Sequence, residues 1–150
     1  MYKNFNTFAF KHILIMNKNA LIFGAIFTML SVVLGAFGAH YLKTIFTPEI
    51  LSSFETGVRY QFYHGLALIL VAILAKENLK YIQLIYYCFL SGTILFSFSI
   101  YLLCFLKSTE TLGLNGIGII TPIGGLFFIV GWSLLIISAM QYSHKEIKNS

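Results

Sequence analysis

Four long apolar segments, separated by short polar stretches, dominate the chain. They cover residues 20–41, 57–75, 81–106 and 122–141. Each is close to the ~20 residues that an α-helix needs to cross the hydrocarbon core of a bilayer, and no stretch between them is long enough for a soluble domain. The pattern predicts an all-α fold: an integral membrane bundle of four helices.

Two of the polar stretches contain signals for the start of a helix. Thr47-Pro48 and Thr121-Pro122 are each typical of an N-cap residue followed by proline in the first helical turn. The first is expected to open a short interfacial helix over residues 48–53 that leads into the second span. The second is expected to start the fourth span at Pro122.

The basic residues are distributed unevenly between the two ends of the predicted bundle. With four spans, seven lysines share one side and only Lys43, Arg59 and Lys107 lie on the other; the seven are Lys3, Lys11, Lys18, Lys76, Lys80, Lys145 and Lys148. Lysine and arginine accumulate in the cytoplasmic loops of membrane proteins. We therefore expect both termini to be cytoplasmic.

Composition supports the membrane interpretation. The chain is 58% hydrophobic and 10% charged, whereas soluble domains contain about 45–50% apolar and about 25% charged residues. The net charge of +5 does not indicate nucleic-acid binding, because the basic residues flank the apolar segments and form no basic stripe. Cys88 and Cys104 lie roughly 24 Å apart if they share one helix, too far for a disulfide.

The predicted membrane domain covers residues 16–142, followed by a polar tail over 143–150. Residues 1–15 form an N-terminal extension that we expect to be dispensable or a start-site misassignment, because Met16-Asn17-Lys18 makes a better natural start. An alternative is a signal peptide, in which residues 21–34 supply the apolar region and residues 36–39 the small-residue cleavage site.

Several polar side chains must lie within the membrane zone. Residues 65–75 are too few to cross alone, so the preceding stretch of residues 59–64 has to enter the membrane. Ionisable groups there usually face the bundle interior. Counting about 1.5 Å of rise per residue, we expect an outward-facing polar pocket formed by His40, Glu55, Arg59, Tyr60, Gln61, His64, Ser97, Tyr101 and Thr121.

Structural roles for the same side chains remain open. Glu55 and Arg59 have the i, i+4 spacing of an interfacial ion pair. His64 could be a neutral core residue bonded to a facing serine or tyrosine, and His40 could be an interface anchor. No spacing of ligands indicates a metal site, and no motif indicates a cofactor.

Small residues predict the faces at which the helices touch. In lipid, close packing replaces the hydrophobic effect as the force between helices, and small residues permit it. The expected packing positions are Gly24, Ser31, Gly35 and Gly38 on the first span and Gly124 and Gly131 on the fourth.

Five motifs together resemble a known family. They are residues 35–40 (GAFGAH), 54–64 (FETGVRYQFYH), 95–101 (LFSFSIY), 120–125 (ITPIGG) and Trp132. In combination they are similar to the membrane family called domain of unknown function 423, whose eukaryotic relatives are called transmembrane protein 256. The resemblance covers about residues 16–141 and disfavours the signal peptide, because the candidate cleavage site falls inside a motif. It implies a four-helix protein of a bacterial inner membrane or a mitochondrion, and it supplies no catalytic residues.

Three functions remain as hypotheses. The first is an accessory or scaffold subunit in the membrane, with a membrane protein or a second copy as partner and lipid around it. The alternative is binding or translocation of a small solute or proton through the polar pocket; histidine ordinarily titrates near neutral pH, so His64 would serve as a relay. An enzyme is the weakest hypothesis, because no activated nucleophile or pair of carboxylates is evident. We expect a multi-pass protein of the bacterial inner membrane.

Overall fold

The structure, a computed structural model, describes the backbone of residues 3–77, 79–109 and 118–149 and the side chains of residues 18–77, 79–109 and 118–142. Five α-helices and three short helical segments follow one another, and no strand occurs in these ranges. In chain order they are α1 (Lys3–His40), η1 (Leu42–Thr44), α2 (Pro48–Leu74), η2 (Ala75–Glu77), α3 (Ile82–Thr93), η3 (Ile94–Phe98), α4 (Ser99–Ser108) and α5 (Ile120–Asn149).

Four stretches of helix are long and apolar enough to cross a membrane. They are Lys18–Thr44, Pro48–Glu77, Ile82–Ser108 and Ile120–Tyr142, so α3, η3 and α4 together form the third crossing. This confirms the predicted all-α fold with four membrane-spanning helices. The part of α1 that precedes Lys18 is helical and continuous with the first span.

The second and fourth spans begin differently from the predictions. Thr47 does cap α2, because its hydroxyl accepts a hydrogen bond from the amide of Ile50. However, no separate interfacial helix precedes the second span, since α2 runs without a break from Pro48. The prediction that Thr121 caps the fourth helix is wrong: α5 already begins at Ile120, and the Thr121 hydroxyl instead lies 2.7 Å from the Ser99 hydroxyl of α4.

A π-helical turn interrupts the third span, which periodicity alone did not predict. The turn, η3, covers Ile94–Phe98 and joins α3 to α4. A π-helix widens one turn of the backbone and often occurs at functional positions. Here the π-helical turn lies where the fourth membrane span meets the third, since η3 packs against α5.

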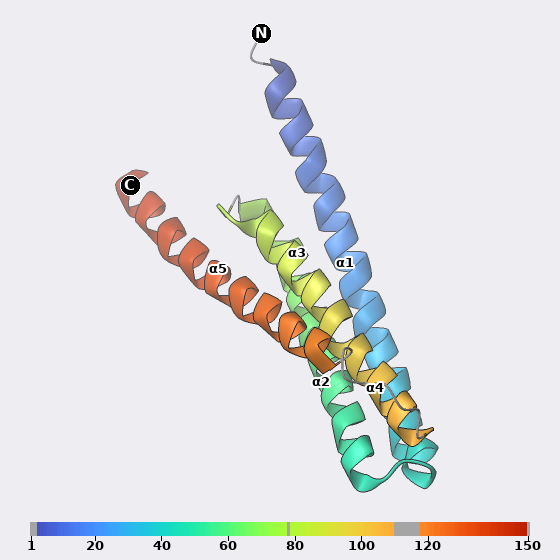
Figure 1. Cartoon of the computed structure of the whole chain (residues 1–150). Coiled ribbons are helices and arrows are strands. Elements are labelled where there is room, and N and C mark those ends of the chain that lie inside the picture. Colours follow the sequence, from blue (N-terminus) through green and yellow to red (C-terminus); the bar gives the residue numbers. More distant parts are fainter. Residues whose placement is uncertain (1–2, 78, 110–117, 150) are drawn as a thin grey trace.

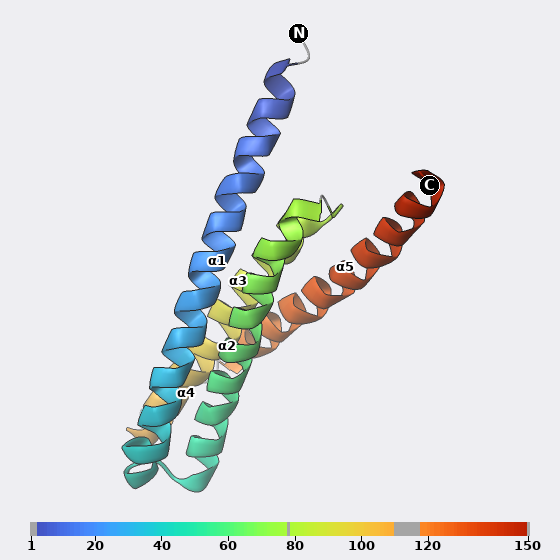
Figure 2. The same cartoon turned by 180° about the vertical axis from the view of Figure 1, so that it is seen from behind.

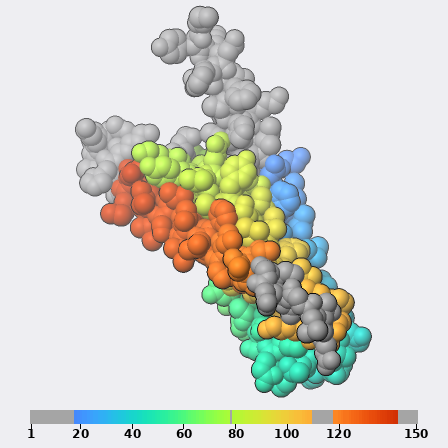
Figure 3. All heavy atoms as spheres, in the orientation of Figure 1, coloured from blue at the N-terminus to red at the C-terminus, as the bar shows by residue number. Residues whose placement is uncertain are grey.

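The helices pack as a row and do not form a closed square (Figure 1). The longest contact is between α1 and α2; α2 then contacts α3, η3 and α4, and α5 packs on α3 and η3. In the space-filling view of Figure 3, the atoms of α5 lie directly beside those of α3. Helices α1 and α5 occupy the two outer positions, and they diverge toward the end of the molecule where both termini lie (Figures 1 and 2).

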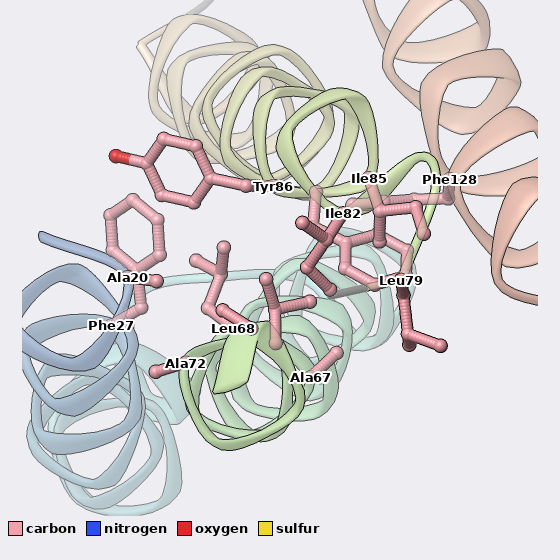
Figure 4. Close-up of a cluster of buried hydrophobic side chains, with 13 residues drawn as sticks. Ala20, Phe27, Ala67, Leu68, Ala72, Leu79, Ile82, Ile85, Tyr86 and Phe128 are labelled. Atoms are coloured by element: carbon pink, nitrogen blue, oxygen red, sulfur yellow. The ribbon is translucent and has the colours of Figure 1, made fainter. Parts of the chain in front are cut away.

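Two apolar clusters hold the row together. The larger one lies toward the α2–α3 turn, which we call the terminal end, and includes Leu68, Val71, Ile85 and Phe89, all completely buried. Figure 4 shows its side chains converging from α1, α2, α3 and α5. The smaller cluster lies at the opposite end, which we call the loop end, and is formed by Leu42, Phe54, Ile100 and Cys104.

Candidate functional site

Gln61, in the middle of α2, connects three helices through its amide group. Its side chain is completely buried. The Nε2 atom donates a hydrogen bond of 2.9 Å to the carbonyl oxygen of Phe27 on α1, and the Oε1 atom accepts one of 2.9 Å from the hydroxyl of Tyr101 on α4. The amide therefore exchanges hydrogen bonds with two neighbouring helices and reaches no solvent.

The bond from Gln61 to α1 depends on glycines. A Cβ atom added to Gly24 would lie only 2.7 Å from the carbonyl oxygen of Gly65, and one added to Gly65 would lie 2.6 Å from the hydroxyl of Thr28. Because neither glycine has a side chain, the α1 and α2 backbones approach closely. That approach brings the Phe27 carbonyl, which also accepts a bond from the Ser31 hydroxyl, within reach of Gln61.

His64, one turn further along α2, connects to α5. Its Nε2 atom lies 3.2 Å from Nε1 of Trp132, and its Nδ1 atom lies 2.9 Å from the carbonyl oxygen of Tyr60. An indole N–H can only donate, so Nε2 of His64 accepts and Nδ1 carries the proton that is donated to Tyr60. Both ring nitrogens are thus bonded, and the bonded form is the neutral imidazole.

Aromatic rings enclose the imidazole. The ring of His64 stacks on that of Phe128 with centroids 3.4 Å apart and planes 9° apart. The ring of Phe89 lies 5.6 Å away on the α3 side, and Tyr60 lies 6.0 Å away on α2 itself. With 5% of His64 exposed, the histidine is a packed part of the junction between α2, α3 and α5.

Ser97 is the remaining deep member of the candidate set. It lies on η3 and is completely buried, and its hydroxyl has no hydrogen-bond partner among the described residues. By contrast, the neighbouring Thr93 donates to the Phe89 carbonyl of its own helix. Ser97 thus lies on η3, which packs against α2 and α5, but it does not join the hydrogen bonds of Gln61 or His64.

The other candidate residues lie at the periphery. Glu55 and Arg59 form the i, i+4 ion pair, with 3.8 Å between charged atoms and about half of each side chain exposed. His40 is exposed at the end of α1, and Thr121 is bonded to Ser99. Thus the structure brings Gln61 together with Tyr101, and His64 with the backbone of Tyr60, but it leaves His40, Glu55, Arg59 and Thr121 outside this core.

The small residues expected at helix contacts differ in how closely they are approached. Cβ atoms added to Gly24, Gly124 and Gly131 would collide with α2, η3 and α3, respectively. One added to Gly38 would press on the Phe54 ring at 3.2 Å, whereas Gly35 has room, 3.6 Å from Val58. Ser31 is buried. Three more glycines with the same close contacts were not predicted: Gly57, Gly65 and Gly92.

Gln61 and His64 line none of three surface cavities in the described part of the chain. The first, of 310 Å³, lies at the loop end between α2, α4 and the start of α5. The second, of 530 Å³, lies beside the α2–α3 turn. A groove of 190 Å³ between α1 and α2 is lined by Gly35, Gly38, Phe54, Glu55, Val58 and Arg59. Among the described residues, no three His, Cys, Asp or Glu side chains are grouped to hold a metal ion.

Sequence reasoning missed Trp132 as the partner of His64. One signal was available: Trp132 is the single tryptophan of the chain and lies near the middle of the predicted fourth span. An indole N–H at that depth has no water to bond and needs an acceptor from another helix. The Phe27 carbonyl left no such signal, because backbone groups are the same at every position.

Comparison with known proteins places the chain among small membrane proteins. The sequence profile described as "Protein of unknown function (DUF423)" matches residues 34–125. A UPF0382 membrane protein of Staphylococcus haemolyticus is 38% identical over 83% of this chain and 98% of its own length. The UPF0382 membrane protein YwdK of Bacillus subtilis is 36% identical over the same shares, and one of Haemophilus influenzae is 43% identical over 67% of this chain and 77% of its own length. No solved structure matches the chain significantly. With 92 of the 150 residues matched by the profile and two of these relatives aligned over 98% of their own length, the protein belongs to the DUF423 family of membrane proteins.

Proposed function

We propose that the protein is an accessory or scaffold subunit that acts through helix contacts within the membrane. One observation carries the proposal: the two deep side chains that bridge helices, Gln61 and His64, have their hydrogen-bond partners inside the fold. Gln61 bonds to Phe27 and Tyr101, and His64 bonds to Tyr60 and Trp132. Buried polar groups that are fully bonded stabilise and specify a packing arrangement.

The same bonds argue against translocation through these residues. A proton relay needs a group that can exchange its proton with water or with another titratable group. The Nε2 atom of His64 accepts from an indole N–H that cannot give up its proton, and stacking on Phe128 covers the ring face. In addition, neither His64 nor Gln61 lines one of the three cavities.

The outer helices offer surfaces for a partner. Helix α1 exposes Met29, Val32 and Val33, and α5 exposes Leu126, Ile129 and Ile136, each by more than half. Because α1 and α5 take the two outer positions of the row, either face is open to a neighbouring membrane protein or to a second copy. Lipid covers the parts of these two faces that no partner contacts.

A flux measurement separates the scaffold from the transport alternative. We expect proteoliposomes that contain the purified protein to be no more permeable to protons or small solutes than protein-free liposomes. The His64→Ala variant should give the same result. A proton or solute flux that depends on the wild-type protein and disappears in His64→Ala would overturn the scaffold and establish the relay.

Photo-crosslinking in native membranes tests the contact directly. A photoreactive amino acid at Val32 or Ile129, both exposed, should give a discrete adduct with one membrane polypeptide. The matched control is the same amino acid at Leu68, which is completely buried and should give no intermolecular adduct. If every exposed position scanned on α1 and α5 reacts only with lipid, the scaffold proposal fails.

We further propose that the protein is a multi-pass component of the bacterial cytoplasmic membrane. The relatives named above are bacterial membrane proteins, and the four apolar helices fit a bilayer. Density-gradient separation of the membranes of a Gram-negative host should place the protein in the inner-membrane fraction. Recovery in the outer-membrane fraction would contradict this.

A further inference from the structure

The cavity at the loop end combines opposite charges with an apolar floor. It has a volume of 310 Å³ and is lined by Glu49, Ile50, Ser53, Thr56, Ile100, Leu103, Cys104, Lys107 and Thr121. Glu49 lies in the first turn of α2 and Lys107 in the last turn of α4. The two charges therefore reach the cavity from different helices, and its formal charge is zero.

Neither charge is neutralised within the described part of the chain. The one ion pair found there joins Arg59 to Glu55, which leaves the Glu49 carboxylate and the Lys107 ammonium without a charged partner. Both side chains are exposed. A ligand that carries one positive and one negative group would complement both at once.

The hydroxyl groups of the lining make the α2 side of the cavity an acceptor surface. The Ser53 hydroxyl already donates to the Glu49 carbonyl at 3.0 Å, and the Thr56 hydroxyl donates to the Ser52 carbonyl at 3.0 Å. The Cys104 thiol likewise points to the Ile50 carbonyl. With their protons committed, these groups can only accept, as can the carboxylate of Glu49. The Thr56 oxygen already accepts from the Arg59 guanidinium at 2.9 Å, so Ser53 and Glu49 are the acceptors left for a ligand. The α2 side thus favours a ligand with N–H donors, and Lys107 favours an anion.

The lining changes from charged at the membrane surface to apolar deeper in the membrane, as a phospholipid does. Glu49 and Lys107 lie at the ends of two membrane-spanning helices, which is the level of the lipid headgroups. Leu103 and Ile100 lie about 6 Å and about 10 Å deeper along α4 and turn apolar side chains to the same cavity. A headgroup at the top would therefore continue into an acyl chain below.

We propose that this cavity binds a phospholipid with a primary ammonium group, that is, a phosphatidylethanolamine. Glu49 and Ser53 accept hydrogen bonds from the ammonium, Lys107 donates to the phosphate, and the first part of one acyl chain lies on Ile100 and Leu103. Phosphatidylcholine carries the same charges, but its quaternary ammonium has no N–H to donate. Phosphatidylglycerol lacks the positive charge altogether.

Native mass spectrometry of the purified, delipidated protein tests the proposal with three lipids of identical acyl chains. Phosphatidylethanolamine should bind about five- to tenfold more tightly than phosphatidylcholine or phosphatidylglycerol, the difference expected for one charge-assisted hydrogen bond. Glu49→Gln should remove the preference for ethanolamine over choline. Lys107→Gln should weaken the binding of both zwitterionic lipids by a similar factor.

Matched controls separate this cavity from the general lipid surface. Glu55→Gln and Lys43→Gln remove charges at the same end of the molecule but outside this cavity, and they should leave the preference unchanged. Equal binding of the three lipids, or a preference that survives Glu49→Gln, would overturn the proposal. If soluble phosphoethanolamine displaces phosphatidylethanolamine at the concentration at which the lipid itself binds, the occupant is not a lipid and the proposal is wrong. No partner protein takes part, so the result does not depend on the scaffold proposal.

Discussion

His64 and Trp132 show how a single residue acquires its role from a distant part of the chain. They are 68 positions apart and lie on helices that pack on either side of α3. The sequence predicted that His64 lies inside the second span, because the apolar stretch after it is too short to cross alone, and the structure has it within the apolar helix Pro48–Glu77. The predicted partner, a facing serine or tyrosine, was wrong, because the donor is Trp132 and the pairing depends on how α5 rotates against α3.

We expect Trp132→Phe to destabilise the protein by about 1 kcal/mol, because the Nε2 acceptor of His64 loses its donor. His64→Phe should also destabilise it, and the double variant should lose about 0.5 kcal/mol less than the sum of the two. Unfolding in mixed lipid–detergent micelles measures all three. Tyr87→Phe, at an exposed position of α3, is the control that should show no coupling with Trp132→Phe. Strict additivity of the His64 and Trp132 changes would contradict the bond.

At the scale of the elements, periodicity and length were sufficient to predict four helices, and Thr47-Pro48 was sufficient to predict the start of α2. The π-helical turn η3 was not predictable in this way, because one widened turn leaves the apolar pattern of its neighbours intact. The packing of α5 explains the position of η3. The backbone of Phe96, in the middle of η3, lies so close to Gly124 that a Cβ atom there would be 2.5 Å from the Phe96 nitrogen.

Gly124→Ala tests this crossing. Alanine ordinarily stabilises a helix by roughly 0.5–1 kcal/mol relative to glycine, but at residue 124 it should destabilise the protein by about 1–3 kcal/mol, because the obstacle is backbone and cannot rotate away. Gly125→Ala is the matched control: its Cβ atom would meet Phe96 at an ordinary 3.8 Å, so it should be neutral or stabilising. Thermal unfolding in detergent measures both. Equal effects of the two changes would rule out a close contact at Gly124.

At the scale of the whole molecule, the two ends differ in charge, and this difference predicts how the row of helices sits in the bilayer. The terminal end contains Glu77 and the end of α5, which are linked by the hydroxyl of Tyr142. The loop end contains η1 and the start of α2. The excess of lysine in the sequence around the terminal end predicts that it faces the cytoplasm.

Cysteine labelling tests this orientation. In a variant with Cys88 and Cys104 replaced by alanine, Thr44→Cys at the exposed loop end should react with a membrane-impermeant maleimide in intact cells. Glu77→Cys, exposed at the terminal end, should react only after the membrane is permeabilised. The reverse pattern would mean that the termini lie on the outside.

A truncated chain tests the prediction for the N-terminal extension. Translation from Met16 keeps the whole first membrane span, Lys18–Thr44, together with Gly24 and Phe27, which contact α2. We therefore expect the same expression level and the same unfolding midpoint as for the full chain. A loss of more than about 1 kcal/mol would show that residues 1–15 are part of the fold.

The separation between His64 and Trp132 also has a consequence for biosynthesis. A nascent chain emerges from the ribosome in order, so the Gln61 amide can find the Phe27 carbonyl as soon as the first hairpin enters the membrane. The imidazole must wait until the indole has been translated, 68 codons later. During that interval the Nε2 atom of His64 lacks its donor, while Nδ1 keeps its bond to the Tyr60 carbonyl of the same helix. Arrival of the last helix thus completes the hydrogen bonds of His64.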